Sequence, residues 1–311
     1  MKWWLLGIVL LLAGGTIWFW QQKRQVVMSP RGEVRLELPY AKYSFARLVE
    51  RGGVASEVTD DNELFFYTSE GRRISGQLHT PEGESRGIVV MARGYIDKET
   101  YKTGMGTRNA AIYYASRGYT TYAPDFSGYG LSDQENENAI GARLVKPVEI
   151  LDLLASLPTD KPIYLWGHSN GGQIMLFVAE ILGKRGDSRV KGLTLWAPVS
   201  KPFPYNILYY TDEADDQGKW LRNAVAEFEQ DYDVYDYSID RYFDWITMPI
   251  KIHQGTADDA IPLEWSDQLA EHLRSLDGIV TYHVYPGADH DMRPSWDIVV
   301  ARDVAFFADL L

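Results

Sequence analysis

The sequence contains no cysteine among its 311 residues. This absence excludes disulfide bridges, thiolate metal sites, a cysteine nucleophile and a lipid-modified cysteine. Basic residues are also too few to balance the acidic ones: 31 lysines and arginines stand against 43 aspartates and glutamates, which leaves a formal net charge of −12. Such a chain offers no basic stripe to replace the counterions of a polyanion, so nucleic acid is excluded as a partner.

Internal repeats and low-complexity tracts are absent as well. With 45% hydrophobic residues, the chain is long enough to bury one large core. This length fits either one α/β domain with an insertion or two smaller domains. The order of the predicted elements, given below, favours the single domain.

The N-terminal segment 1–24 carries one uncharged, mostly apolar run over residues 3–20. As a helix rising ~1.5 Å per residue, this run reaches roughly 27 Å, about the thickness of a bilayer core. Aromatic side chains stand at both of its ends, where the two membrane interfaces would lie. The run predicts a single membrane-spanning anchor. The alternative is a cleaved signal peptide, with the small residues A-G-G at 13–15 as its processing site.

The charges on the two sides of this anchor give opposed indications of its orientation in the membrane. Lys23, Arg24, Arg31 and Arg35 follow the run, and counting positive charges places the main domain in the cytoplasm. A short head with Lys2 before an apolar run is instead typical of an export signal. We interpret the segment as an anchor that leaves the main domain extracytoplasmic.

Residues 25–60 are polar and mixed, and indicate a tether with an edge strand at 33–38. Residues 61–311 indicate one domain that opens with a hairpin, 64–68 and 72–80, around Glu70-Gly71. Strands and helices then alternate, which predicts a mostly parallel sheet covered on both faces. The expected strands are 87–92, 119–123, 163–166, 192–196, 250–254 and 281–285, and the expected helices are 109–117, 144–157, 174–182, 263–276 and 295–311.

The alternation breaks between residues 201 and 245. This stretch contains 12 aromatic residues, and its 11 acidic residues outnumber the four basic ones. An insertion that follows a strand pointing at a site is expected to cover that site. We therefore predict a lid over about 199–247, with an aromatic wall and an acidic mouth that disfavours anionic substrates.

The segment Y-L-W-G-H-S-N-G-G at 164–172 contains a G-x-S-x-G motif centred on Ser169. A buried-type strand precedes the motif and an apolar helix follows it. A sharp strand-to-helix turn exposes the serine hydroxyl, and the backbone N–H of Asn170 then lies near the site of a developing oxyanion. The alternative interpretation is a tight turn with an incidental serine.

A serine nucleophile needs a histidine base and an acid that orients it. His290, in the P-G-A-D-H-D loop at 286–291, leaves the last expected strand and is the predicted base. His168 lies inside the serine turn, and His272 lies in a helix. The other histidines fall within expected strands, where a structural role is favoured: His79, His253 and His283. Asp258 or Asp259, in the loop after strand 250–254, supplies the acid.

The order Ser169, aspartate, His290 on alternating β/α units resembles the α/β-hydrolase superfamily over residues 60–311. Three further segments carry the resemblance: G-T-A-D at 255–258, G-A-D-H-D at 287–291, and A-P-D-F-S-G-Y-G-L-S at 123–132. The spacing in the family's acid loop selects Asp258. Among branches of the family, the sequence is loosely similar to the serine aminopeptidase-like and monoacylglycerol-lipase-like group.

One segment departs from the family pattern. The loop after strand 87–92 usually begins with His-Gly, and here residues 93–95 are R-G-Y. The resemblance implies that the backbone N–H groups of Tyr95 and Asn170 form the oxyanion hole. Arg93 has three readings: a salt bridge to the acidic lid, a ligand for a substrate carboxylate, or a structural ion pair.

These observations predict a serine hydrolase that cleaves carboxylic esters through an acyl-enzyme on Ser169, as a carboxylesterase or lipase-like enzyme does. Asp258 and His290 complete the triad. The expected substrate is a small, apolar, non-anionic ester, and neither metal nor organic cofactor is implied. A serine peptidase and a membrane-tethered binding module without turnover are the alternatives. The sequence indicates no oligomeric state.

Overall fold

The computed structural model describes residues 25–28, 34–135, 138–158, 160–214 and 216–311. The predicted anchor over residues 3–20 lies outside these residues. Within the described ranges, no helix combines the length and the apolar character needed to cross a bilayer.

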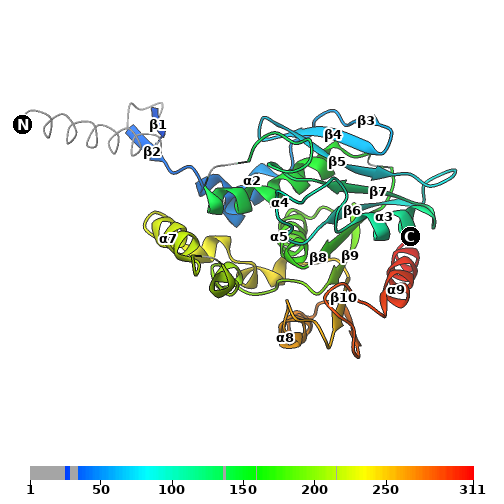
Figure 1. Ribbon diagram of the computed structural model, residues 1–311. Helices are drawn as coiled ribbons and strands as arrows, with labels where there is room; N and C mark the ends of the chain where they lie inside the picture. Colours follow the sequence, from blue (N-terminus) through cyan, green and yellow to red (C-terminus); the bar gives the residue numbers. More distant parts are fainter. Residues whose placement is uncertain (1–24, 29–33, 136–137, 159, 215) are drawn as a thin grey trace, which may run out of the picture.

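The centre of the molecule is a nine-stranded sheet with the order β11-β10-β9-β8-β6-β7-β5-β4-β3 (Figure 1). The six strands from β11 to β7 run parallel, and β5, β4 and β3 continue the sheet antiparallel. Their bounds are β3 Thr59–Asp61, β4 Leu64–Ser69, β5 Arg72–His79, β6 Gly87–Ala92, β7 Tyr119–Pro124, β8 Ile163–His168, β9 Val190–Trp196, β10 Ile250–Gly255 and β11 Val280–Tyr285. The mostly parallel sheet predicted from the sequence is confirmed.

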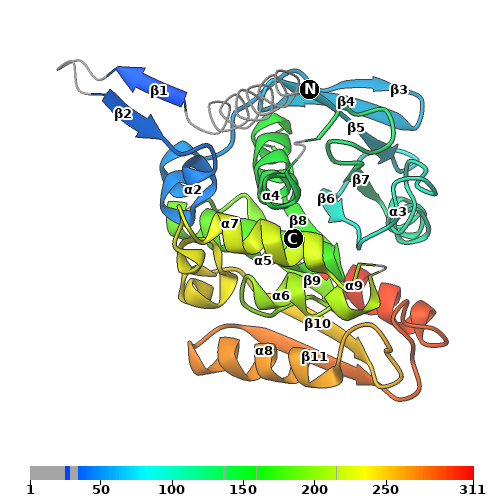
Figure 2. The same cartoon turned by 60° about the vertical axis from the view of Figure 1, so that its left-hand side comes forward.

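Helices cover both faces of this sheet (Figure 2). On one face lie α4 Ala139–Ser156 and α5 Asn170–Arg185, which pack against each other, with α8 Leu263–Ser275 against β10 and β11. On the other face lie α3 Arg108–Ala115 and α9 Trp296–Asp309. A separate apolar core fills each interface. Because the strands β6, β8, β10 and β11 are parallel, the loops that carry Arg93, Ser169, Asp258 and His290 all leave the same edge of the sheet.

The segment before the domain differs from the sequence-based expectation. A strand does form within 33–38, as β2 Val34–Glu37, but it pairs with β1 Gln25–Met28 in a separate two-stranded sheet. Residues that had been assigned to a tether form the helix α2 Phe45–Arg51. Ser44 caps this helix, and its buried Phe45 stacks on Phe177 of α5 with ring centroids 3.8 Å apart. Contact with α5, rather than local propensity, stabilises α2.

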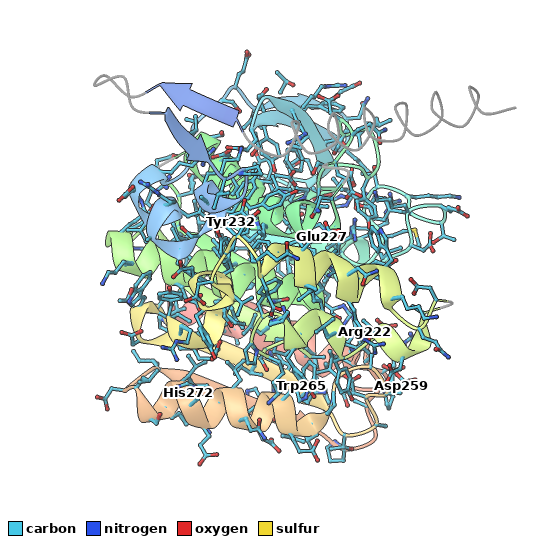
Figure 3. All side chains as sticks on the ribbon, turned by 90° about the vertical axis from the view of Figure 1, so that its left-hand side faces the viewer. Arg222, Glu227, Tyr232, Asp259, Trp265 and His272 are labelled. Carbon is cyan, nitrogen blue, oxygen red and sulfur yellow. The ribbon has the colours of Figure 1, made fainter. Side chains whose placement is uncertain are left out.

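Between β9 and β10 the described residues form short helices: α6 Tyr205–Leu208, η2 Thr211–Glu213, α7 Lys219–Phe228, η3 Val234–Tyr237, η4 Ile239–Arg241 and η5 Phe243–Trp245. Figure 3 shows the face of the molecule that is formed by α7 and α8. Arg222 and Glu227 belong to α7, and His272 belongs to α8. Part of the aromatic content of this region is buried, as for Phe228, whose ring stacks on Tyr232 at 4.5 Å. Tyr205, Tyr209 and Trp220 remain exposed.

Candidate active site

Ser169 occupies the turn between β8 and α5 in a strained backbone conformation, with φ 55° and ψ −122°. A non-glycine residue in this region costs roughly 1–3 kcal/mol, and such a residue persists only where the surroundings impose it. Here the Ser169 N–H donates to the Trp196 carbonyl at 2.9 Å, and the Ser169 carbonyl accepts from the Val199 N–H at 3.0 Å. Both contacts come from β9 and the loop after it, so the neighbouring strand holds the turn open.

Gly171 allows the turn to approach the next strand. A Cβ atom at Gly171 would lie 2.0 Å from the Ala92 carbonyl oxygen, far inside van der Waals contact. Gly94, in the loop after β6, is equally close to the site, because its Cβ would lie 3.0 Å from Cβ of Ser169. The glycines therefore bring the 93–95 loop against the serine.

We expect Gly171→Ala to lower the free energy of unfolding by about 2–4 kcal/mol, because the added methyl group must displace backbone. The shift of the loop after β6 should also remove most of any hydrolytic activity. Gly186→Ala is the comparison variant, since Gly186 has open space around it; its positive φ of 67° makes alanine cost about 1–2 kcal/mol there, and the activity should stay unchanged. Thermal denaturation and initial rates measure both effects; equal melting and equal activity of the two variants would contradict this role of Gly171.

His290 and Asp258 lie in contact. Nδ1 of His290 is 3.0 Å from both carboxylate oxygens of Asp258. The same carboxylate accepts from the backbone N–H groups of Ala260 and Ile261 at 2.9 and 2.8 Å, and from the side-chain amide of Gln254 at 2.9 Å. Burial alone would raise the pKa of Asp258, but the hydrogen bonds from His290 and Ile261 outweigh burial and lower that pKa below its usual value. Asp258 is therefore ionised at neutral pH.

Asp259, the other acid that the sequence left open, points elsewhere. Its side chain is exposed beside the start of α8 (Figure 3). No hydrogen bond between Asp259 and His290 occurs among the described residues. The structure thus brings Asp258, and not Asp259, to the histidine.

His168 supports the loop that carries His290. Its Nε2 lies 3.0 Å from the His290 carbonyl oxygen, and the two rings are 4.6 Å apart. Burial, followed by the charge of His290, lowers the pKa of His168 to about 4. A neutral imidazole at His168 can hold the loop by a hydrogen bond without competing for the catalytic proton.

A second histidine–aspartate pair lies away from this edge. His253 places Nε2 2.9 Å from Asp303 and Nδ1 2.7 Å from the Tyr285 hydroxyl. Both His253 and Asp303 are completely buried, so neither can meet a substrate. The structural role predicted for His253 agrees with this geometry.

Ser169 and His290 are not hydrogen-bonded to each other. Among the described hydrogen bonds, none joins Oγ of Ser169 to the His290 imidazole. Both side chains are partly exposed at the same edge of the sheet. In unliganded active sites such a contact is often long and tightens only when substrate binds.

Arg93 takes neither of the ion-pair roles considered from the sequence. Its side chain is buried and donates to the carbonyl oxygens of Gly94 and Asp125 at 2.9 and 3.1 Å. The guanidinium lies over the rings of Tyr101 and Tyr129, 4.3 and 4.1 Å from their centroids. No carboxylate forms a salt bridge with Arg93 within the described ranges. Arg93 instead fixes the loop after β6, and the same loop carries the backbone of Tyr95.

The two amides predicted to form the oxyanion hole are available. In the part of the chain that the structure describes, the backbone N–H groups of Tyr95 and Asn170 have no hydrogen-bond acceptor. Tyr95 is 71% exposed. Free N–H groups at a helix N-terminus and in an adjacent loop are suited to bind an anionic oxygen.

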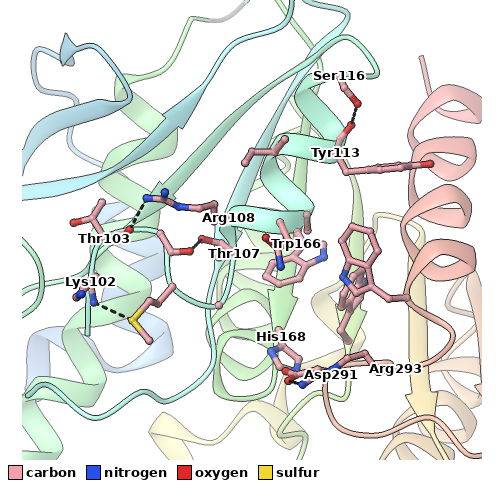
Figure 4. A pocket seen from close by; sticks show the side chains of 18 residues that line it. Lys102, Thr103, Thr107, Arg108, Tyr113, Ser116, Trp166, His168, Asp291 and Arg293 are labelled. Carbon is pink, nitrogen blue, oxygen red and sulfur yellow. Dashed lines mark hydrogen bonds and ion pairs between the residues drawn. The ribbon is translucent and has the colours of Figure 1, made fainter. Parts of the chain in front are cut away.

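Two cavities adjoin this edge. One, of about 1060 Å³, is lined by the residues before and within α3 and by Trp166, His168 and Trp296; His168 and Asp291 lie at one end of it (Figure 4). Ser169 and His290 do not line this cavity. The other, of about 50 Å³, lies between α4, α5 and the segment that joins β9 to β10, and Asn170 lines it.

Four polar residues of the smaller cavity were not predicted from the sequence: Arg143, Lys146, Gln173 and Asn206. The available signal was two cations three residues apart at the start of an otherwise apolar helix. No group of three metal-ligating side chains lies together within the described residues.

Comparison with known proteins agrees with this architecture. A family model described as the alpha/beta hydrolase fold matches residues 107–238. The chain thus shares the fold of the α/β hydrolases, as the resemblance of its sequence implied.

A curated relative is the mitochondrial palmitoyl-protein thioesterase ABHD10 of Homo sapiens, with 27% identity over 227 residues, 70% of this chain and 71% of that protein. Among solved structures, Est1E from Butyrivibrio proteoclasticus with bound ferulic acid has a TM-score of 0.57 at 19% identity, and covers 79% of this chain and 98% of its own. A puromycin-hydrolyzing peptidase of Mycobacterium tuberculosis has a TM-score of 0.59 at 18% identity, and covers 93% and 43%. Both structures are similar in fold.

Proposed function

We propose that this protein is a serine hydrolase that cleaves carboxylic esters through an acyl-enzyme on Ser169. The observation that supports it most strongly is the contact of His290 with Asp258 at 3.0 Å, at the edge of the sheet where Ser169 lies in a strained turn. A histidine held by an ionised carboxylate is the base that a serine hydroxyl requires.

In the proposed reaction Oγ of Ser169 attacks the ester carbonyl carbon while Nε2 of His290 takes the hydroxyl proton. Asp258 accepts a hydrogen bond from Nδ1 and stabilises the imidazolium. The tetrahedral intermediate expels the alcohol, which receives the proton from His290. Water then repeats the same steps on the acyl-enzyme, releases the carboxylic acid and restores Ser169.

The backbone N–H groups of Tyr95 and Asn170 are the proposed donors to the oxyanion of both intermediates. Each donor of this kind lowers the barrier by about 2.7–4 kcal/mol in comparable hydrolases. Arg93 acts on one of them indirectly, because its hydrogen bonds to Gly94 and Asp125 fix the loop before Tyr95.

The exposed aromatic rings near the site favour a substrate with an apolar part. Tyr205 and Tyr209 of the lid lie within 6.1 and 4.8 Å of the Trp265 ring, and form an aromatic surface beside the loop of Asp258. The relative named as a palmitoyl-protein thioesterase makes an acyl thioester a natural second substrate to test. Oxygen esters and thioesters form the same acyl-enzyme, so the triad serves both.

A substrate panel tests this assignment. The full chain is assayed with p-nitrophenyl esters of two to sixteen acyl carbons, with an acyl thioester series of the same lengths, and with aminoacyl p-nitroanilides. We expect hydrolysis of esters with a maximum at one chain length. Faster turnover of the anilides, relative to their intrinsic reactivity, would make the protein a peptidase, and turnover of none would leave a binding module.

The proposed localisation is a single anchor over residues 3–20 with the hydrolase domain on the extracytoplasmic side. The segment that supports it lies outside the described residues, so the support is the sequence pattern alone. Protease added to intact cells should digest the domain. A domain that is digested only after lysis would place it in the cytoplasm.

A further inference from the structure

The small cavity beside Asn170 is lined by two cations. Arg143 and Lys146 project from the first turns of α4, while Asn170 and Gln173 line the cavity from α5 and Asn206 from α6. Asn170 follows Ser169 directly, so the cavity begins one residue from the proposed nucleophile. Its volume of about 50 Å³ is close to that of one or two water molecules.

Within the described residues, Arg143 and Lys146 form neither a salt bridge nor a hydrogen bond. Two acidic groups act on Lys146 from a distance: one is engaged elsewhere and the other is only partly ionised at neutral pH. Glu135 pairs with Lys98, and burial raises the pKa of Glu149, which accepts from the Ser127 N–H, to about 7.

The cations are also close enough to repel one another. Burial, followed by the charges of Arg143 and Arg93, lowers the pKa of Lys146 to about 7, against the weaker opposite effect of Glu149 and Glu135. Burial likewise lowers the pKa of Arg143. The Lys146 ammonium lies over the rings of Tyr129 and Phe126, 5.6 and 5.9 Å from their centroids. Arg143 and Lys146 are half-buried, so their unpaired charges are partly desolvated, and a bound anion would offset that cost.

Asn206 also lines the cavity. Its side chain is only 4% exposed, and its Oδ1 has no hydrogen-bond partner in the described part of the chain. This oxygen is an acceptor and does not itself bind an anion; rotation of the amide would be needed to bring its NH₂ group to the cavity.

We propose that this cavity binds a carboxylate of the substrate, so that the ester cleaved at Ser169 carries a negatively charged acyl chain, as in a monoester of a dicarboxylic acid. This inference rests on the proposed function and names its substrate class. It reverses the expectation of a non-anionic substrate, which came from the acidic lid. The charges beside the nucleophile, rather than those at the mouth, act on the bound acyl group.

The test compares matched pairs of esters on the full chain. Mono-p-nitrophenyl esters of dicarboxylic acids with five to eight carbons are set against p-nitrophenyl esters of the monocarboxylic acids of equal length, with spontaneous hydrolysis subtracted. We expect kcat/KM to favour the anionic ester at one length or more by at least about tenfold, as for a hydrogen bond to a charged group.

Charge removal from the cavity should abolish this preference. Lys146→Met and Arg143→Met should each lower the anionic-to-neutral ratio of kcat/KM by about tenfold. Lys191→Met is the matched control, because Lys191 is exposed at the far end of β9 and contacts Ser188. It removes the same charge from the molecule and should leave the ratio unchanged.

The pH dependence of the same ratio adds a readout that simple damage to the fold would not give. Both esters use one triad, so the pH dependence of the triad cancels in the ratio. Since kcat/KM reports the free enzyme, the ratio should fall as the pH rises through about 7, because Lys146 loses its proton there and Glu149, whose pKa is raised to about 7, gains its negative charge.

Two outcomes separate the subsite from the proposed function. The protein could hydrolyse neutral esters, show no preference for anionic esters at any length, and keep the same anionic-to-neutral ratio of kcat/KM in Lys146→Met. This outcome would overturn the subsite alone. Failure of Ser169 to react with a fluorophosphonate would overturn the proposed function. In that case calorimetric titration of the full chain with monomethyl adipate tests the anion subsite by itself. Binding that Lys146→Met weakens supports the subsite, and the absence of binding overturns it.

Discussion

Ser169→Ala is expected to lower kcat/KM for the best ester substrate by a factor on the order of 10⁴ to 10⁶. The substitution removes the only atom that forms the acyl-enzyme and leaves the His290–Asp258 pair without a proton to accept. Alanine fits the same space, and the backbone contacts of residue 169 with Trp196 and Val199 involve no side-chain atom. The fold should therefore survive.

Initial rates and thermal denaturation, measured on the same preparations, check this result. Ser275→Ala is the control, because Ser275 is an exposed serine on α8 that bonds only to the carbonyl of His272. It should behave as the unmodified protein. A Ser169→Ala protein that keeps more than about a hundredth of the activity, with an unchanged melting temperature, would show that another group carries the reaction.

Asp258→Asn has the second largest expected effect, a loss of about 10⁴ in kcat at neutral pH. The backbone N–H groups of Ala260 and Ile261 require an acceptor, so the amide oxygen of the new side chain should face them. Its NH₂ group then faces Nδ1 of His290. That nitrogen must become an acceptor, the proton moves to Nε2, and the histidine can no longer act as a base.

Asp259→Asn is the matched control for this prediction. It removes the same charge one residue away, from an exposed side chain. Its kcat should stay within about twofold of the unmodified protein, as is usual for a change at an exposed surface position. Equal losses in the two variants would mean that the general negative charge of this loop matters, and not the contact with His290.

Much of the fold could be predicted because buried parallel strands have a simple pattern. The segment 87–92, predicted as a strand, is β6, and both of its faces are buried, so it consists of one uninterrupted apolar run. The turn at Glu70-Gly71 could also be predicted, since both residues adopt positive φ values of 50° and 74° between two alternating strands. These features depend on local sequence.

The features that were missed depend on distant contacts. The helix α2 is short and gains its stability from α5, more than a hundred residues further along the chain. Arg93 was expected to meet a carboxylate, and instead the carbonyl oxygens of Gly94 and Asp125 accept its hydrogen bonds. Residue spacing within one segment does not contain such information.

The residues of the candidate site also fall into two groups, those that belong to a local sequence motif and those that depend on distant contacts. The loops of Ser169, Asp258 and His290 each carry a local motif, and a parallel sheet brings the ends of their strands to one edge. The choice between Asp258 and Asp259 came from the resemblance alone, and the structure gives it a geometric basis. The cation pair of Arg143 and Lys146 belongs to no motif, because its meaning arises only when α4, α5 and the lid enclose one cavity.

The most direct measurement of the central claim is the reaction of the full chain with a fluorophosphonate, followed by mass spectrometry of its peptides. Our account predicts one phosphonylated residue, Ser169, with no labelling in Ser169→Ala and much slower labelling in Asp258→Asn. An unlabelled protein, or a label that Ser169→Ala retains, would contradict it.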